Sequence, residues 1–265
     1  MDKNNSQAEN LDSYSDLERT IDILLSPGGC PWDREQTHES LKRNLIEECY
    51  ELIDAIEKED IPNMVEELGD ILMQVGFHIN IGQRSGKFDA SDVFKNINNK
   101  LINRHPHVFA GGETRTADEV KAQWEDIKQQ EKKDKGNTSR LDSIPKTLPA
   151  LAYAQLVQDR AHLAGFDWDD YSGVVDKVAE EINELSEAAN SEERIDELGD
   201  ILFSLVNVGR WMEIQVEDCL RQANSKFQRR FTYMEDICRQ RNISLSDISI
   251  SDKQSLWDEA KLAVG

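Results

Sequence analysis

An internal repeat constrains the fold of this 265-residue chain more than any other feature of its sequence. The acidic run EECYE at 47–51 corresponds to EEINE at 180–184, and ELGDIL occurs twice, at 67–72 and 197–202. Matched motifs that recur in the same order over a long period are typical of duplicated structural units. We therefore expect two copies of one unit of about 110 residues each.

Acidic motifs alone are weak support for duplication, because 52 of the 265 residues are Asp or Glu. At that frequency, about one chance match to E-E-x-x-E followed by E-x-x-D is expected in such a chain. The order of several unrelated motifs is much more specific, and it establishes common ancestry of the two halves. The further matches are Trp-Asp at 32–33 and 168–169, Lys100 and Arg104 with Lys226 and Arg230, and Trp124 and Lys128 with Trp257 and Lys261.

Apolar residues recur at the spacing of amphipathic helices through most of the chain. With only 14 Gly and 6 Pro, the chain has few positions that break helices or form hairpin turns. We predict an all-α protein of two tandem helical-bundle domains related by internal duplication. The predicted helices cover residues 17–25, 40–57, 63–79, 91–104, 116–133, 151–164, 174–189, 195–211, 216–239 and 256–263.

Changes in composition predict the limits of the domains. A polar N-terminal tail covers residues 1–16, and the first repeat domain follows at 17–131. Residues 132–149 mix Lys, Asp, Gly, Asn, Ser and Pro, as an exposed linker does, and the second domain covers 150–265.

The overall charge and the distribution of apolar residues exclude several classes of protein. A net charge of −21 argues against direct binding to nucleic acids, which requires a clustered basic excess. No stretch approaches the roughly 20 apolar residues needed to cross a membrane, and the N-terminus lacks the pattern of a secretory signal. The four cysteines form no C-x-x-C pair, so we expect free thiols in a cytoplasmic protein.

Acidic side chains three residues apart lie on one face of a helix, so Glu48 and Glu51 project together, as do Glu67 and Asp70. In an antiparallel helix pair these four carboxylates can converge. Their mutual repulsion favours a bound cation, and all-oxygen ligands favour Mg²⁺ or Mn²⁺. A solvated acidic face is the alternative interpretation. The second copy offers the same set: Glu181, Glu184, Glu197 and Asp200.

Basic and aromatic residues at helical spacing suggest contacts with a nucleotide. Lys226 and Arg230, one helical turn apart, could hold a polyphosphate, as could Lys100 and Arg104. A tryptophan could stack on a base without reading its identity. Ordinary helix salt bridges and packing of tryptophan against the core are the alternatives. The aromatic and basic pairs concerned are Trp124 with Lys128 and Trp257 with Lys261.

Two further motifs, C-P-W-D-x-x-Q-T at 30–37 and R-H-P-H-V-F at 104–109, complete a resemblance to a known family. Together with E-E-x-x-E and E-L-G-D, they resemble MazG, the tandem-domain nucleoside triphosphate pyrophosphohydrolases. The resemblance covers nearly all of residues 17–263. It implies two MazG domains, usually in a homodimer, that use Mg²⁺ to hydrolyse nucleoside triphosphates to monophosphate and pyrophosphate. It also implies little base preference and a role in cleaning or regulating the nucleotide pool.

The resemblance also implies roles for individual residues, and in the family the C-terminal copy is credited with activity. The first copy keeps its matching residues, so the sequence gives no reason for it to be inactive. Because the loop between the carboxylate pairs is three residues shorter in the second copy, contacts carried over within 188–196 are in doubt. The implied metal ligands are Glu181, Glu184, Glu197 and Asp200, and the implied nucleotide contacts are Lys177, Glu180, Glu181, Lys226, Arg229, Arg230, Trp257 and Lys261.

The chemistry that we expect is attack of a metal-activated water on the α-phosphorus, while Lys226 and Arg230 hold the departing pyrophosphate. Glu180, beside Glu181, is a candidate for orienting that water. A di-iron bundle is disfavoured because it needs E-x-x-H on two helices, and only residues 35–38 match. A stronger rival is a non-catalytic helical protein that senses nucleotides or binds partners.

Overall fold

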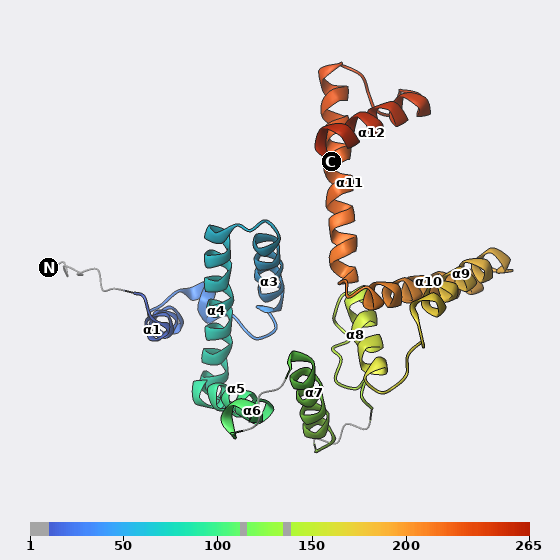
Figure 1. Cartoon of the computed structure of the whole chain (residues 1–265). Coiled ribbons are helices and arrows are strands. Elements are labelled where there is room, and N and C mark those ends of the chain that lie inside the picture. The colour runs from blue at the N-terminus through green and yellow to red at the C-terminus, as the bar shows by residue number, and fades with distance from the viewer. Residues whose placement is uncertain (1–10, 112–115, 135–138) are drawn as a thin grey trace. The chain divides into compact units, whose positions relative to one another are not determined.

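The computed structural model describes residues 11–111, 116–134 and 139–265, and every regular element within these ranges is a helix (Figure 1). The predicted all-α fold class is therefore confirmed. The chain divides into two compact units, Met1–Ile127 and Lys128–Gly265. The limits expected for the tail, the domains and the linker stay a prediction. Residues 1–10 of the tail and 135–138 of the linker lie outside the described residues.

The N-terminal unit is built on a hairpin of two long helices, α3 and α4, with α1 packed against α4 (Figure 1). Its buried core joins these three elements through Ile21 and Leu25 of α1, Leu41 before α3, and Phe77 of α4. The last helix, α7, runs across the division between the units. The helices are α1 (Tyr14–Leu25), α2 (Pro31–Arg34), α3 (Lys42–Glu57), α4 (Ile61–Arg84), α5 (Ala90–Arg104), α6 (Pro106–Phe109) and α7 (Ala117–Asp134).

The C-terminal unit repeats this arrangement, with α9 and α10 as the hairpin and α8 packed against α10. Beyond the hairpin, α11 and α12 pack on each other around a core of Met234, Cys238, Leu256 and Ala260 (Figure 1). The helices are α8 (Ala150–His162), α9 (Tyr171–Glu187), α10 (Ser191–Trp211), α11 (Val216–Gln240) and α12 (Ile250–Val264).

Polar caps place several helix starts earlier than the apolar pattern predicts. The Asp170 side chain accepts a hydrogen bond from the backbone nitrogen of Gly173 at 3.0 Å, and α9 begins at Tyr171, directly after Asp170. Asn190 caps α10 in the same way. Ser249 caps α12, which begins six residues before its predicted start at 256. A cap is polar and lies outside the apolar stripe, so periodicity misses the first turn.

None of the helices in the described ranges is long and apolar enough to span a lipid bilayer.

Candidate divalent-metal and nucleotide site

The hairpin of the C-terminal unit gathers three carboxylates from two helices. Oxygen atoms of Glu181 on α9 and of Glu197 and Asp200 on α10 all lie within 4.8 Å of one another. Glu184, the fourth predicted ligand, is not part of this group, although its charge contributes to raising the pKa of Glu197. We call Glu181, Glu197 and Asp200 the C-terminal acidic cluster.

The N-terminal hairpin carries an equivalent group. Glu48 of α3 and Glu67 and Asp70 of α4 also present oxygens within 4.8 Å of one another. Here Glu51 is the predicted ligand that lies outside the group, and its charge helps to raise the pKa of Glu48. We call Glu48, Glu67 and Asp70 the N-terminal acidic cluster. The duplication therefore extends from the motifs to the geometry that they build.

Burial and like charge act together on the C-terminal acidic cluster. Partial burial raises the pKa of Glu197, and the charges of Glu184, Glu181 and Asp200 raise it further. Glu181 is only 4% exposed, yet it carries a carboxylate. Glu197 is half-buried and Asp200 is exposed, so the cluster combines one buried carboxylate with two that solvent reaches. Clustered carboxylate oxygens that repel one another are the donor set that a hard divalent cation takes, so the residues fit Mg²⁺ or Mn²⁺.

Lys177, one turn before Glu181 on α9, stands at the edge of this cluster. Its Nζ lies 2.7 Å from an oxygen of Glu180 and 2.7 Å from an oxygen of Glu181. Hydrogen bonds to these two carboxylates raise the pKa of Lys177, so it stays charged. Lys177 thus partly offsets the charge of the buried Glu181 and places a cation beside the cluster.

The predicted nucleotide contacts on α11 and α12 form a separate group. The Arg230 guanidinium lies 5.7 Å from the centre of the Trp257 ring, and its Nε donates to the carbonyl oxygen of Gly265. Lys261 pairs with Asp258 at 2.8 Å. Lys226 and Arg229 are exposed on α11. In the described part of the chain, α12 makes no contact with α9 or α10, so the structure does not bring this group to the C-terminal acidic cluster.

The N-terminal copy repeats the pairing of arginine with tryptophan. The guanidinium of Arg104 lies 5.1 Å from the centre of the Trp124 ring, joining α5 to α7. Lys100 is exposed on α5, one turn before Arg104, and Lys128 is half-buried on α7. An arginine therefore lies over each tryptophan. Trp257 also packs against the core of α11 and α12, so it takes part both in the core and in the cationic surface.

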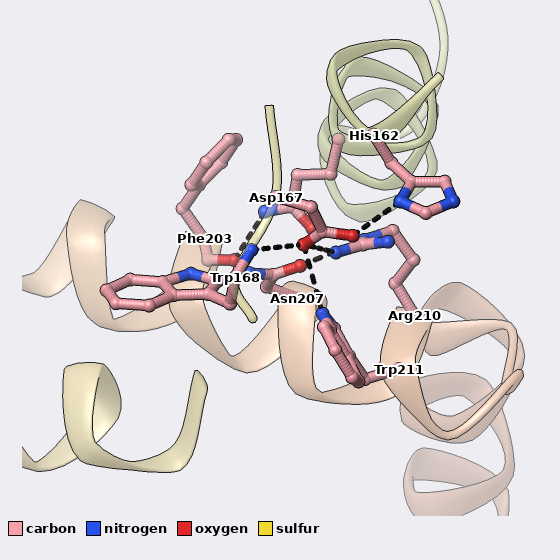
Figure 2. A network of polar contacts seen from close by, with 8 residues as sticks. His162, Asp167, Trp168, Phe203, Asn207, Arg210 and Trp211 are labelled. Carbon is pink, nitrogen blue, oxygen red and sulfur yellow. Dashed lines mark hydrogen bonds and ion pairs between the residues drawn. The ribbon is translucent and has the colours of Figure 1, made fainter. Parts of the chain in front are cut away.

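Sequence reasoning missed a buried ion-pair network centred on Asp167 (Figure 2). Arg210 Nη2 and Trp211 Nε1 donate to Asp167 Oδ1 at 2.5 and 3.1 Å, and His162 Nδ1 lies 2.5 Å from Oδ2. The side chains of Arg210 and Asp167 are 10% and 15% exposed. One signal in the sequence could have indicated this network: Arg210 lies close to the apolar stripe of the predicted helix 195–211. An arginine in such a position needs a partner of opposite charge.

Stability at low pH should depend on this network. Burial acts to raise the pKa of Asp167, but hydrogen bonds from Arg210, the Trp168 backbone, Trp211 and His162 outweigh it and lower the pKa from 3.8 to about 2. A lowered pKa gives stability that is complete above about pH 4 and is lost as the pH falls through about 2. We expect Asp167→Asn to lower the free energy of unfolding by about 2 kcal/mol at pH 6. Urea unfolding at several pH values should show this difference shrinking below about pH 4, and a pH-independent difference would contradict the assignment.

Parts of the network and two residues of the C-terminal acidic cluster line one cavity of about 840 Å³. Lys177, Glu181 and Asp200 lie on it, as do Asp167, Trp168 and Arg210. Ligand cavities in proteins have volumes of about 300–1,000 Å³. A small molecule in this cavity would therefore be in contact with the candidate metal ligands.

Duplicated helical units with an acidic cluster on each hairpin define a tandem all-α protein with candidate metal sites. The family model described as "MazG nucleotide pyrophosphohydrolase domain" matches residues 36–109 and 170–234, once in each unit. The chain belongs to this MazG family of hydrolases, which confirms the resemblance found in its motifs.

Three curated relatives extend the match over most of the chain. The nucleoside triphosphate pyrophosphohydrolase/pyrophosphatase MazG of Thermotoga maritima is 45% identical over 94% of this chain and 95% of its own length. The nucleoside triphosphate pyrophosphohydrolase of Escherichia coli K12 is 41% identical over 88% of this chain and 90% of its own. The uncharacterized protein YabN of Bacillus subtilis is 47% identical over 94% of this chain, which spans 51% of that protein.

Proposed function

We propose that this chain hydrolyses nucleoside triphosphates to nucleoside monophosphate and pyrophosphate at its C-terminal acidic cluster, with Mg²⁺ as cofactor and Mn²⁺ as a substitute. The convergence of Glu181, Glu197 and Asp200 within 4.8 Å carries the proposal. These carboxylates repel a negatively charged triphosphate, so the substrate can bind beside them only when a cation neutralises their charge. The names of the relatives from Thermotoga maritima and Escherichia coli support the reaction class. We further propose low base specificity, a role in nucleotide-pool cleaning or regulation, and a cytoplasmic location.

The cation would be held by the C-terminal acidic cluster, with Glu184 as a fourth ligand. When bound, it supplies charge neutralisation for the phosphate oxygens and acidifies the water that attacks the α-phosphorus. Glu180, held by Lys177 at 2.7 Å, is placed one residue from the cluster and would orient that water. Lys177 itself would contact the phosphates from the edge of the cluster.

The nucleotide contacts on α11 and α12 stay proposals, because the structure does not bring these residues to the C-terminal acidic cluster. Lys226 and Arg230 lie one turn apart and would steady the departing pyrophosphate, with Arg229 beside them. Trp257, already under the Arg230 guanidinium, and Lys261 would contact the nucleotide. In the N-terminal copy Glu48, Glu51, Glu67, Asp70, Lys100, Arg104, Trp124 and Lys128 are the corresponding candidates.

We also propose a homodimer. The hairpin helices leave many large apolar side chains exposed, which is unusual for a monomer and typical of an association surface. Sedimentation equilibrium giving the mass of a single chain would contradict a dimer. The exposed residues include Ile46, Val65, Leu68 and Leu72 in the N-terminal hairpin, and Ile182, Leu198, Leu202 and Leu205 in the C-terminal hairpin.

Product analysis tests the proposed reaction. Incubation with ATP and Mg²⁺ should yield AMP and pyrophosphate in equal amounts, resolved by ion-exchange chromatography, and a panel of other triphosphates should be cleaved at the same bond. ADP and phosphate as products would show that a different bond is cleaved. Binding of ATP without any product would favour the nucleotide sensor instead.

A further inference from the structure

The cavity beside the C-terminal acidic cluster has a filled counterpart in the N-terminal unit. Three matched pairs set the register between the copies: Trp32 with Trp168, the Glu48 motif with that of Glu181, and the ELGDIL motifs. In this register Ile21, Leu25, Leu41 and Phe77 correspond to Val157, Ala161, Val174 and Asn207.

These two sets of four residues have opposite roles in their units. Ile21, Leu25, Leu41 and Phe77 form one buried cluster, and none of them is more than 6% exposed. Their four counterparts all line the cavity of about 840 Å³ in the C-terminal unit. Every C-terminal residue is smaller than its N-terminal match, and the largest change replaces a phenylalanine with an asparagine. The space that a hydrophobic core occupies in one copy is therefore open in the other.

A buried polar atom on the cavity supports a role for this open space beyond loose packing. Gln158 is 7% exposed and lines the cavity, and its Nε2 donates to the carbonyl oxygen of Phe203 at 2.7 Å. Its Oε1 has no hydrogen-bond partner among the described residues. A buried acceptor without a donor costs about 1–3 kcal/mol, so it points to a ligand that supplies the donor.

Close packing and an ion pair fix the positions of residues that line the cavity. A Cβ atom on Gly173 would lie 2.9 Å from the Trp168 ring, so the absence of a side chain lets this ring lie against the first turn of α9. The Asp167 and Arg210 ion pair ties the segment before Trp168 to α10 (Figure 2). In the register of the repeat, Pro31 and Asn80 take the places of Asp167 and Arg210, so the N-terminal copy lacks this tie.

We infer that the cavity receives the nucleoside end of the substrate, and that Ile21, Leu25, Leu41 and Phe77 exclude a nucleoside from the N-terminal copy. This inference rests on the proposed function. The aromatic face of Trp168 and the unpartnered Gln158 oxygen suit a base with its hydrogen-bond donors. Lys177, Glu181 and Asp200 lie on the same cavity and would meet the phosphates. The sizes of the residues at these four matched positions thus leave a nucleoside pocket in the C-terminal copy and fill it in the N-terminal copy.

Filling the cavity in the full-length protein tests the inference. Ala161→Leu and Asn207→Phe, made separately, each restore the bulk of the N-terminal match, and Ala164→Leu adds the same atoms at an exposed position nearby. We expect each filling variant to raise KM for both ATP and CTP by about tenfold or more. The affinity for inorganic tripolyphosphate, which lacks a nucleoside, should stay within about twofold by calorimetry. Ala164→Leu should match the wild type in both measurements.

Two outcomes would overturn the inference: unchanged KM in a folded filling variant, or an equal loss of affinity for ATP and tripolyphosphate. If neither variant folds by circular dichroism, the wild type still tests it. AMP should then change the tryptophan emission of the wild type but not that of Trp168→Phe. Tripolyphosphate should leave the emission of both proteins unchanged. No response to AMP would overturn the inference. Absence of AMP as a reaction product of the wild type would instead contradict the proposed function.

Discussion

Full-length protein carrying Glu197→Gln is expected to lose about 100-fold or more of its ATP turnover, a loss of about 3 kcal/mol in transition-state stabilisation. The substitution removes one negative charge from the C-terminal acidic cluster and leaves the side chain nearly the same size. Steady-state release of pyrophosphate measures the effect. Because the pKa of Glu197 is raised by burial and like charge, removing that charge should not lower the melting temperature without added metal.

Two matched substitutions make this result specific. Glu235→Gln changes an exposed acid on α11, outside both acidic clusters, and should leave turnover within about twofold of the wild type. Glu67→Gln changes the equivalent residue of the N-terminal acidic cluster and should also have a small effect, because a hydrophobic core fills the matching cavity. Full activity in Glu197→Gln together with a large loss in Glu67→Gln would show that the active site lies in the N-terminal copy.

The variant Arg210→Leu is expected to lower the free energy of unfolding by about 3 kcal/mol, because it leaves the buried Asp167 carboxylate without its cation. Asp167 would retain its hydrogen bonds with Trp211, the backbone of Trp168 and His162, but it would lose the permanently charged guanidinium. Urea denaturation at pH 7, followed by circular dichroism, measures the change.

An exposed ion pair provides the control for this prediction. Arg239 is 76% exposed and pairs with Asp236 on α11, so Arg239→Leu should cost less than about 1 kcal/mol. The double variant Asp167→Leu with Arg210→Leu should recover part of the loss, since no unpaired charge remains. Equal effects of Arg210→Leu and Arg239→Leu would show that the network contributes no more than a surface contact.

The sequence was sufficient for the features that repeat. Two copies of ELGDIL and of the E-E-x-x-E motif predicted two hairpins, and three of the four carboxylates predicted in each copy do converge. Helical spacing of Glu67 and Asp70 determines this outcome locally, because residues three apart on one helix share a face whatever surrounds them. Pairing with Glu48 then needs only the short connection between α3 and α4.

Features that depend on the difference between the copies could not be predicted in this way. The cavity exists because Phe77 and Leu25 of one copy are replaced by Asn207 and Ala161 in the other, and their proximity in space depends on the packing of α8 against α10. The partner of Arg210 lies 43 residues away, in a loop with no periodic pattern. The spacing of residues along the sequence does not give the distance between α12 and the hairpin. Only the structure shows that Trp257 is separated from the C-terminal acidic cluster.

Each hairpin gathers carboxylates at one point, where we propose that a divalent cation binds. Titration with Mn²⁺ followed by electron paramagnetic resonance tests this binding most directly. The wild type should bind Mn²⁺ at saturable sites from which Mg²⁺ displaces it. Uptake should fall in Glu197→Gln with Asp200→Asn, and should disappear when Glu67→Gln and Asp70→Asn are added. Equal uptake and equal affinity in all of these proteins would contradict the claim.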